Sequence, residues 1–162
     1  MAGIALSEVE RTYFGFHSHP DSIRVARVLR EFGVWKSVRM SPDELSGAKW
    51  WFKPEGKEEL IRMLNQDGRL HTVGEVARFF ADYKEDIRRV DAAFVEKIDG
   101  IEKSVSRGVE LPPIIMVGGR NPLAVPSMIE GYHRSLGICV ADLRGVGKGR
   151  TYEVYLGRKK WL

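Results

Sequence analysis

The chain has 162 residues, 43% apolar and 30% charged, which suits a globular protein of one domain with an appended subdomain. Its net charge of +4 permits contact with nucleotides or nucleic acid without requiring it. The single cysteine excludes an internal disulfide, and no apolar run approaches the roughly 18 residues that span a membrane. Because the first residues also lack a signal-peptide pattern, we expect a cytoplasmic protein without a membrane partner.

The first predicted unit, residues 1–33, is an N-terminal helical extension. A capping-box pattern predicts a short helix that ends near Tyr13, and a second helix is predicted from Pro20 to about Phe32. The second helix has one apolar face and one arginine-rich face. These arginines either contact phosphates or form a solvated face, and the solvated face is favoured. The sequence assigns the extension no function.

The second predicted unit, residues 34–162, begins with a strand and a helix. Val34–Met40 alternates apolar and polar side chains and is predicted to be a half-buried strand. A Ser-Pro-Asp-Glu sequence follows and starts a helix, with serine as the cap and acids in the first turn. Asp43 and Glu44 either complement this helix end or place carboxylates near a site at the strand end. Residue chemistry alone favours the first interpretation.

Three consecutive aromatic residues, Trp50, Trp51 and Phe52, follow that helix and precede a turn at 53–56. Aromatic side chains of this kind can stack on a nucleobase or on another ring. They can equally form a hydrophobic plug beneath a loop. The sequence favours the plug, because nothing beside the three residues specifies a ligand.

A helical insertion is predicted at about 57–94. One helix covers 57–65, and a Thr-x-x-Glu capping box at Thr72 starts another that runs to Tyr83. A charged helix then covers 85–105. The first two helices have the outline of a helix-turn-helix, but few base-reading side chains stand at the start of the second. Helix packing is therefore favoured over DNA reading.

Residues 108–134 organise the rest of the chain. A double proline precedes the apolar run Ile114–Val117, which predicts a buried strand; a Gly-rich loop, a second short strand and the sequence Glu-Gly-Tyr-His-Arg follow. A short helix is predicted next, over Ser135–Val140. Glycine lets a ligand approach the backbone, a helix start offers free N–H groups, and arginine clamps an anion. The pattern predicts a phosphate site; the alternative is that His133 and Arg134 brace the turn.

The order of these parts resembles the ParB N-terminal/sulfiredoxin superfamily. The resemblance lies in Ile-x-x-x-Val-x-x-Gly, Val-Glu-Leu-Pro-Pro-Ile-Ile, Glu-Gly-Tyr-His-Arg and a final Glu-Val-Tyr-Leu-Gly strand, and it covers roughly Val95 to Gly157. Residues 35–45 are similar to the first strand and helix of the family. The resemblance implies an α+β fold, a small mixed sheet flanked by helices, with the helical segment as an inserted or appended subdomain.

The motif is closest to the Asp-Gly-His-His-Arg of the free-serine-kinase branch of this superfamily. By this resemblance Glu130 helps catalysis or holds Mg²⁺, and Glu44 or Asp43 corresponds to a glutamate that the kinase carries after its first strand. The residues implied to bind nucleotide phosphates are Gly131, Tyr132, His133 and Arg134. The cysteine that sulfiredoxin carries in this motif is absent, which disfavours a sulfinic-acid reductase.

The resemblance therefore implies a phosphotransferase that uses ATP or another nucleotide with Mg²⁺. Its acceptor would be a hydroxyl on a small metabolite or on a modified base in DNA. One alternative is a nucleotide-binding, ParB-like DNA-binding protein without catalysis, to which the helix pair and the basic tail at 157–162 would contribute. A third is a ParB-like nuclease, for which Asp43, Glu44 and Glu130 are the candidate carboxylates. The sequence does not specify the oligomeric state.

Overall fold

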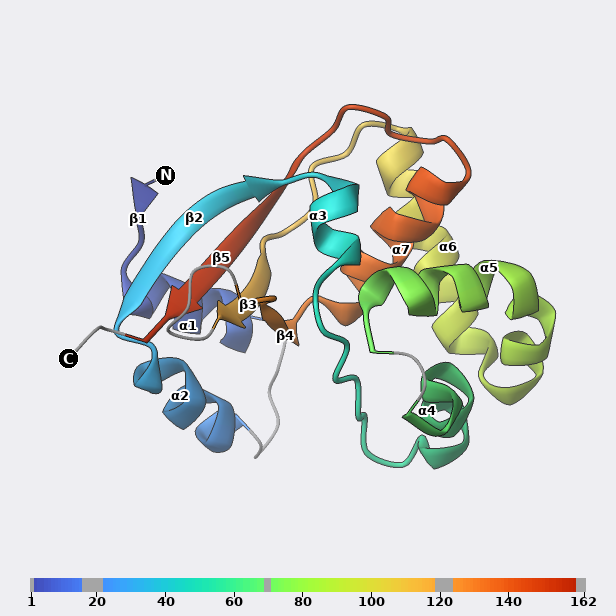
Figure 1. The fold of residues 1–162 in the computed structure, drawn as a ribbon, viewed down its shortest axis with the longest axis horizontal. Helices are drawn as coiled ribbons and strands as arrows, with labels where there is room; N and C mark the ends of the chain where they lie inside the picture. Colours follow the sequence, from blue (N-terminus) through green and yellow to red (C-terminus); the bar gives the residue numbers. More distant parts are fainter. Residues whose placement is uncertain (1, 16–21, 69–70, 119–123, 160–162) are drawn as a thin grey trace.

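The computed structural model describes residues 2–15, 22–68, 71–118 and 124–159. Within these residues the protein has seven helices and one five-stranded mixed sheet (Figure 1), so the predicted α+β class is confirmed. The predicted helix start at Pro20, most of the Gly-rich loop and the end of the basic tail lie outside the described residues. None of the helices in the described ranges is long and apolar enough to cross a membrane.

The sheet has the strand order β1-β2-β5-β3-β4. Its strands are β1 (Ala2–Gly3), β2 (Val34–Met40), β3 (Ile114–Gly118), β4 (Ser127–Glu130) and β5 (Tyr152–Arg158). β5 pairs antiparallel with β2 and parallel with β3, and β4 pairs antiparallel with β3. The last strand of the chain therefore lies in the middle of the sheet and joins its two halves.

The strand β3, next to β5, is buried along its whole length, because helices cover both faces of the sheet. Ile114 and Met116 belong to a larger core on one face, whereas Ile115 and Val117 belong to a smaller core on the other. Successive side chains of a strand point to opposite faces, so this division follows from the backbone. Burial on both faces also explains why the strand reads as one continuous apolar run.

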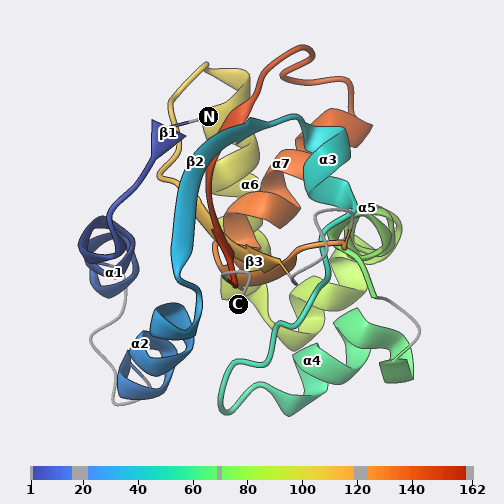
Figure 2. The ribbon, with the colours of Figure 1, turned by 60° about the vertical axis from the view of Figure 1, so that its left-hand side comes forward.

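The N-terminal residues cover the face of the smaller core. α1 (Leu6–Phe14) and α2 (Ser22–Glu31) lie on this side, as Figure 2 shows, and β1 extends the sheet beside β2. The predicted helical extension thus contributes a strand as well as two helices. The buried residues of the smaller core are Val9, Tyr13, Leu29, Phe32, Trp35, Ile115, Val117 and Tyr155.

The other helices form the larger core with the opposite face of the sheet (Figures 1 and 2). They are α3 (Pro42–Ser46), α4 (Glu58–Asn65), α5 (Val73–Val90), α6 (Ala92–Ser106) and α7 (Tyr132–Leu143), with a 3₁₀ turn at Gln66–Gly68. α6 and α7 approach closely at Gly137, where an added Cβ would lie 2.6 Å from Cγ2 of Ile101. A glycine at this position therefore allows the two helices to pack.

The boundaries of α5, α6 and α7 differ from the predictions. α5 continues through a kink at Tyr83 to Val90, and α6 starts after Asp91, not at residue 85. Asp91 has extended backbone angles and its side chain accepts a hydrogen bond from the backbone N–H of Phe94 at 2.9 Å, so it caps α6. α7 is longer than predicted at both ends, because it begins at Tyr132, three residues before Ser135, and ends at Leu143, three residues after Val140.

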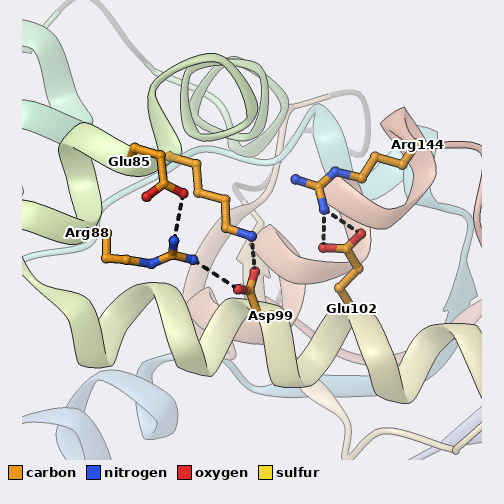
Figure 3. Close-up of polar contacts among 6 residues, drawn as sticks. Glu85, Arg88, Asp99, Glu102 and Arg144 are labelled. Carbon is orange, nitrogen blue, oxygen red and sulfur yellow. Dashed lines mark hydrogen bonds and ion pairs between the residues drawn. The ribbon is translucent and has the colours of Figure 1, made fainter.

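Ion pairs connect the three long helices near the surface, as Figure 3 shows. Asp99 of α6 pairs with Lys84 and Arg88 of α5 at 2.6 and 3.5 Å, and Glu102 of α6 pairs with Arg144, just beyond α7, at 2.7 Å. Partly exposed pairs of this kind contribute about 0–1 kcal/mol each. The helices are therefore held mainly by their apolar faces.

Candidate functional site

The predicted phosphate motif lies where β4 ends and α7 begins. Glu130 is the last residue of β4, and Gly131 follows with a φ of 95°, in the left-handed region that favours glycine. A Cβ at this position would lie 3.1 Å from Cγ1 of Ile114 and 3.2 Å from Nη2 of Arg134. Both the backbone conformation and the close neighbours therefore require glycine here.

No side chain of the described residues caps the start of α7. The carbonyl of Gly131 accepts hydrogen bonds from the backbone N–H and the hydroxyl of Ser135, at 2.8 and 2.9 Å, and this fixes the first turn. Ser135 is fully buried, so the turn is anchored in the core. A helix of twelve residues that begins in this way has the positive end of its dipole and its first N–H groups directed at the turn, which favours an anion.

Arg134 is turned toward the sheet. Its guanidinium pairs with the carboxylate of Glu130 and donates to the backbone carbonyl of Pro113 at 3.0 Å. Each side chain of the pair is 13% exposed, so the two charges compensate one another in a largely desolvated position. A phosphate that binds Arg134 would have to compete with the carboxylate of Glu130.

His133 is packed among aromatic rings. Its ring centroid lies 5.4 Å from that of Phe52 and 5.4 Å from that of Phe94. Burial lowers the pKa of His133 to about 4, and the positive charges of Lys97, Lys57 and Arg134 act in the same direction, whereas Asp91 opposes them. At neutral pH the imidazole is therefore uncharged and can offer a phosphate a hydrogen bond but no charge.

Tyr132 is occupied by structural contacts. Its hydroxyl donates to the carbonyl of Met128 at 2.8 Å, and its ring packs against Trp50 and Phe52 with centroid distances of 5.2 and 5.5 Å. Burial raises the pKa of Tyr132, and the charge of Glu130 raises it further. The phenol therefore stays protonated and holds β4 to α7. Only the backbone N–H of Tyr132 is then left for the predicted binding of phosphate.

The structure does not bring Asp43 and Glu44 to this turn. The carboxylate of Glu44 accepts from the backbone N–H and hydroxyl of Ser41, at 2.7 and 3.1 Å, in a complete capping box of α3. α3 packs against the second half of α7, where the thiol of Cys139 donates to the carbonyl of Pro42 at 3.7 Å. Cys139 is about 12 Å along the helix from Gly131, at ~1.5 Å per residue. Glu44 is therefore a capping residue, and Asp43 is an acid of the same first turn.

The described residues offer Mg²⁺ a single carboxylate at the turn, that of Glu130, and it is already paired with Arg134. In the parts of the chain that the structure describes, no group of three or more His, Cys, Asp or Glu side chains could hold a metal ion. This donor set does not fit a protein-ligated Mg²⁺, and we derive no step through a metal.

Sequence reasoning missed a cavity of about 580 Å³ beside the motif. It forms because Lys49 makes isolated bridges to Thr72, at the start of α5, and to Ser127 of β4, which brings three distant segments together. Trp50 is shared by the two places, since it lines the cavity and packs against Tyr132. The residues that line the cavity are Gly47, Lys49, Trp50, Trp51, Lys53, Asn65, Gly68, His71, Thr72 and Val125.

Comparisons with known proteins find no match to any family model, to any curated protein or to any solved structure. The relation to the ParB/sulfiredoxin superfamily therefore stays a prediction from the sequence motif. The function has to be argued from the geometry of the turn and its surroundings.

Proposed function

We propose that the protein is a nucleotide-dependent phosphotransferase of ParB/sulfiredoxin-like type, which transfers a phosphoryl group from ATP or a related nucleotide to a hydroxyl. The observation that carries the proposal is the turn at Gly131. It joins an uncapped start of a twelve-residue helix to an adjacent, largely desolvated Glu130–Arg134 pair. A helix start binds anions through its N–H groups, and an acid beside an anion clamp supplies the base that transfer requires.

In this mechanism the phosphate binds at the first turn of α7 and takes over Arg134 from Glu130. Arg134 then neutralises the charge that develops on the transferred group. The released Glu130 carboxylate accepts the proton of the acceptor hydroxyl as the acceptor oxygen bonds to phosphorus and the bond between phosphorus and the nucleotide oxygen breaks. His133, uncharged at neutral pH, donates one hydrogen bond to a phosphate oxygen.

Labelled-phosphate transfer tests the proposal. The protein is incubated with γ-labelled ATP, Mg²⁺ and a panel of hydroxyl amino acids, nucleosides and hydroxymethylated DNA. Arg134→Gln should abolish transfer. Arg144→Gln is the matched control, because it removes an arginine–glutamate pair at the other end of α7 and should transfer normally.

A double variant, Glu130→Gln with Arg134→Gln, removes both charges of the pair and so avoids an unpaired buried carboxylate. It should fold, as judged by circular dichroism, and still fail to transfer. Transfer by either Arg134 variant at the wild-type rate would refute the site. Nucleotide binding without transfer, together with salt-sensitive retention of DNA, would instead support the non-catalytic alternative.

The nuclease alternative gains no support from the described residues. Its candidate carboxylates lie apart, Asp43 and Glu44 at the start of α3 and Glu130 at the start of α7. Glu44 caps α3, and Glu130 pairs with Arg134. A metal-dependent nuclease requires carboxylates that converge on one metal site.

A further inference from the structure

The cavity beside Trp50 lies between the sheet side and the helical side of the molecule. The connection from α3 to α4 descends between the sheet and α4 in Figure 1, and residues 47–53 of this connection form one wall. The end of α4 and the start of α5 form another, and Val125, just before β4, contributes to a third. A volume of about 580 Å³ is within the range of cavities that enclose a small organic ligand.

Trp51 gives this cavity an accessible aromatic face. Its neighbours Trp50 and Phe52 are 5% and 7% exposed and pack into the larger core, which matches the plug predicted for all three. Trp51 is 57% exposed and lines the cavity instead. A large aromatic side chain left in this position offers a platform on which a planar ring can stack.

The charge of the lining selects an anion. Lys49 and Lys53 line the cavity with His71, and the Nζ of Lys53 lies 5.8 Å from the centroid of the Trp51 ring. Among the described lining residues none is acidic. The carboxylate of Glu75, three residues after Thr72, is engaged as the cap acceptor of the N–H groups of His71 and Thr72. A cation held over an aromatic ring suits a ligand that combines a planar ring with a negative group.

Two polar atoms of the lining residues have no hydrogen-bond partner among the described residues. They are Nε1 of Trp50, a donor, and Oδ1 of Asn65, an acceptor, and both are buried. Buried polar atoms are normally paired, so these two are available to a ligand that carries both an acceptor and a donor. The edge of a nucleobase carries both, and it reaches these atoms only if the lining residues shift, since each atom exposes less than 1 Å².

We propose that this cavity binds one nucleotide unit, with the base stacked on Trp51 and the phosphate at Lys49 and Lys53. The lining residues given above include none of the phosphate turn of α7, although Trp50 of the lining packs against Tyr132 of the turn. The unit has two sources with the same chemistry: a free mononucleotide, or a nucleotide extruded from a nucleic-acid strand. The proposal does not depend on phosphoryl transfer.

Equilibrium dialysis of the full chain tests the site. The probes are the four labelled 5′-mononucleotides and a labelled single-stranded DNA of nine nucleotides. Trp51→Leu should weaken binding at least tenfold, and the double variant Lys49→Gln with Lys53→Gln should weaken it at least fivefold and reduce its salt dependence. Lys148→Gln, an exposed lysine in the loop after α7, is the matched control and should bind as the wild type does.

Mononucleotides that bind and displace the DNA identify the free nucleotide as the source. DNA binding that depends on Trp51 while mononucleotides fail to bind identifies the strand. Unchanged binding of both probes to Trp51→Leu, or equal binding of a nucleoside and its nucleotide, would overturn the proposal. The double variant Glu130→Gln with Arg134→Gln should lose phosphoryl transfer but keep nucleotide binding at the cavity. The experiment therefore distinguishes a failure of the proposed phosphotransferase from a failure of the proposed cavity site.

Discussion

The buried His133 predicts that the stability of the protein falls in mild acid. In the unfolded chain the imidazole takes up a proton below its ordinary pKa of 6.5, whereas in the folded protein it does so only below about 4. The folded pKa is the lower one, so the stability is complete above pH 6.5 and is lost as the pH falls toward 4. Each pKa unit corresponds to about 1.4 kcal/mol, so the total loss is roughly 3 kcal/mol.

Urea unfolding between pH 7.5 and 4.5 measures this loss, and His133→Phe isolates it. Phenylalanine fits beside Phe52 and Phe94 but cannot take up a proton, so the variant should lose about 2–3 kcal/mol less than the wild type over this range. His71→Gln, which removes an exposed histidine outside the aromatic cluster, is the control for the loss of a histidine. Equal pH dependence of the wild type and His133→Phe would refute the reasoning.

Three substitutions test the packing of the core and the cap of α6. Gly157→Ala would place a Cβ 2.6–2.8 Å from three ring atoms of the buried Trp35, so it should lower the free energy of unfolding by about 1–3 kcal/mol. Gly100→Ala is the control, because no atom lies within 4 Å of its Cβ, and it should not lower the free energy of unfolding. Asp91→Ala should cost about 1 kcal/mol, because it removes the cap of α6 and the partner of Lys57. Urea unfolding at pH 7.5 measures all three, and a Gly157→Ala protein as stable as the wild type would show that Trp35 can move.

Local signals in the sequence predicted much of the fold. The alternation in Val34–Met40 and the apolar run before residue 118 became β2 and β3. Ser41 and Thr72 begin α3 and α5 in complete capping boxes, since serine or threonine and a glutamate three residues later suffice to form one. The cap at Asp91 was missed because no glycine or proline marks the end of α5 there.

The site was less accessible to sequence reasoning, because its properties come from distant neighbours. The motif predicted the glycine turn, but the partner of Arg134 at Pro113 and the rings around His133 come from other elements. The sequence also treated Trp50 and Trp51 alike, although Trp50 is buried and Trp51 is exposed. That difference depends on the bridges of Lys49 to two segments far along the chain, and no local pattern encodes such pairings.

The two faces of β3 have a consequence for how the chain can be divided. Ile115, Val117 and Tyr155 of the central strands are covered by the residues before Val34. A fragment that starts at Val34 would present these side chains to water as an apolar surface and would tend to self-associate. The N-terminal segment thus completes the smaller core on this face of the sheet. A shortened protein that carries the motif should therefore retain this segment.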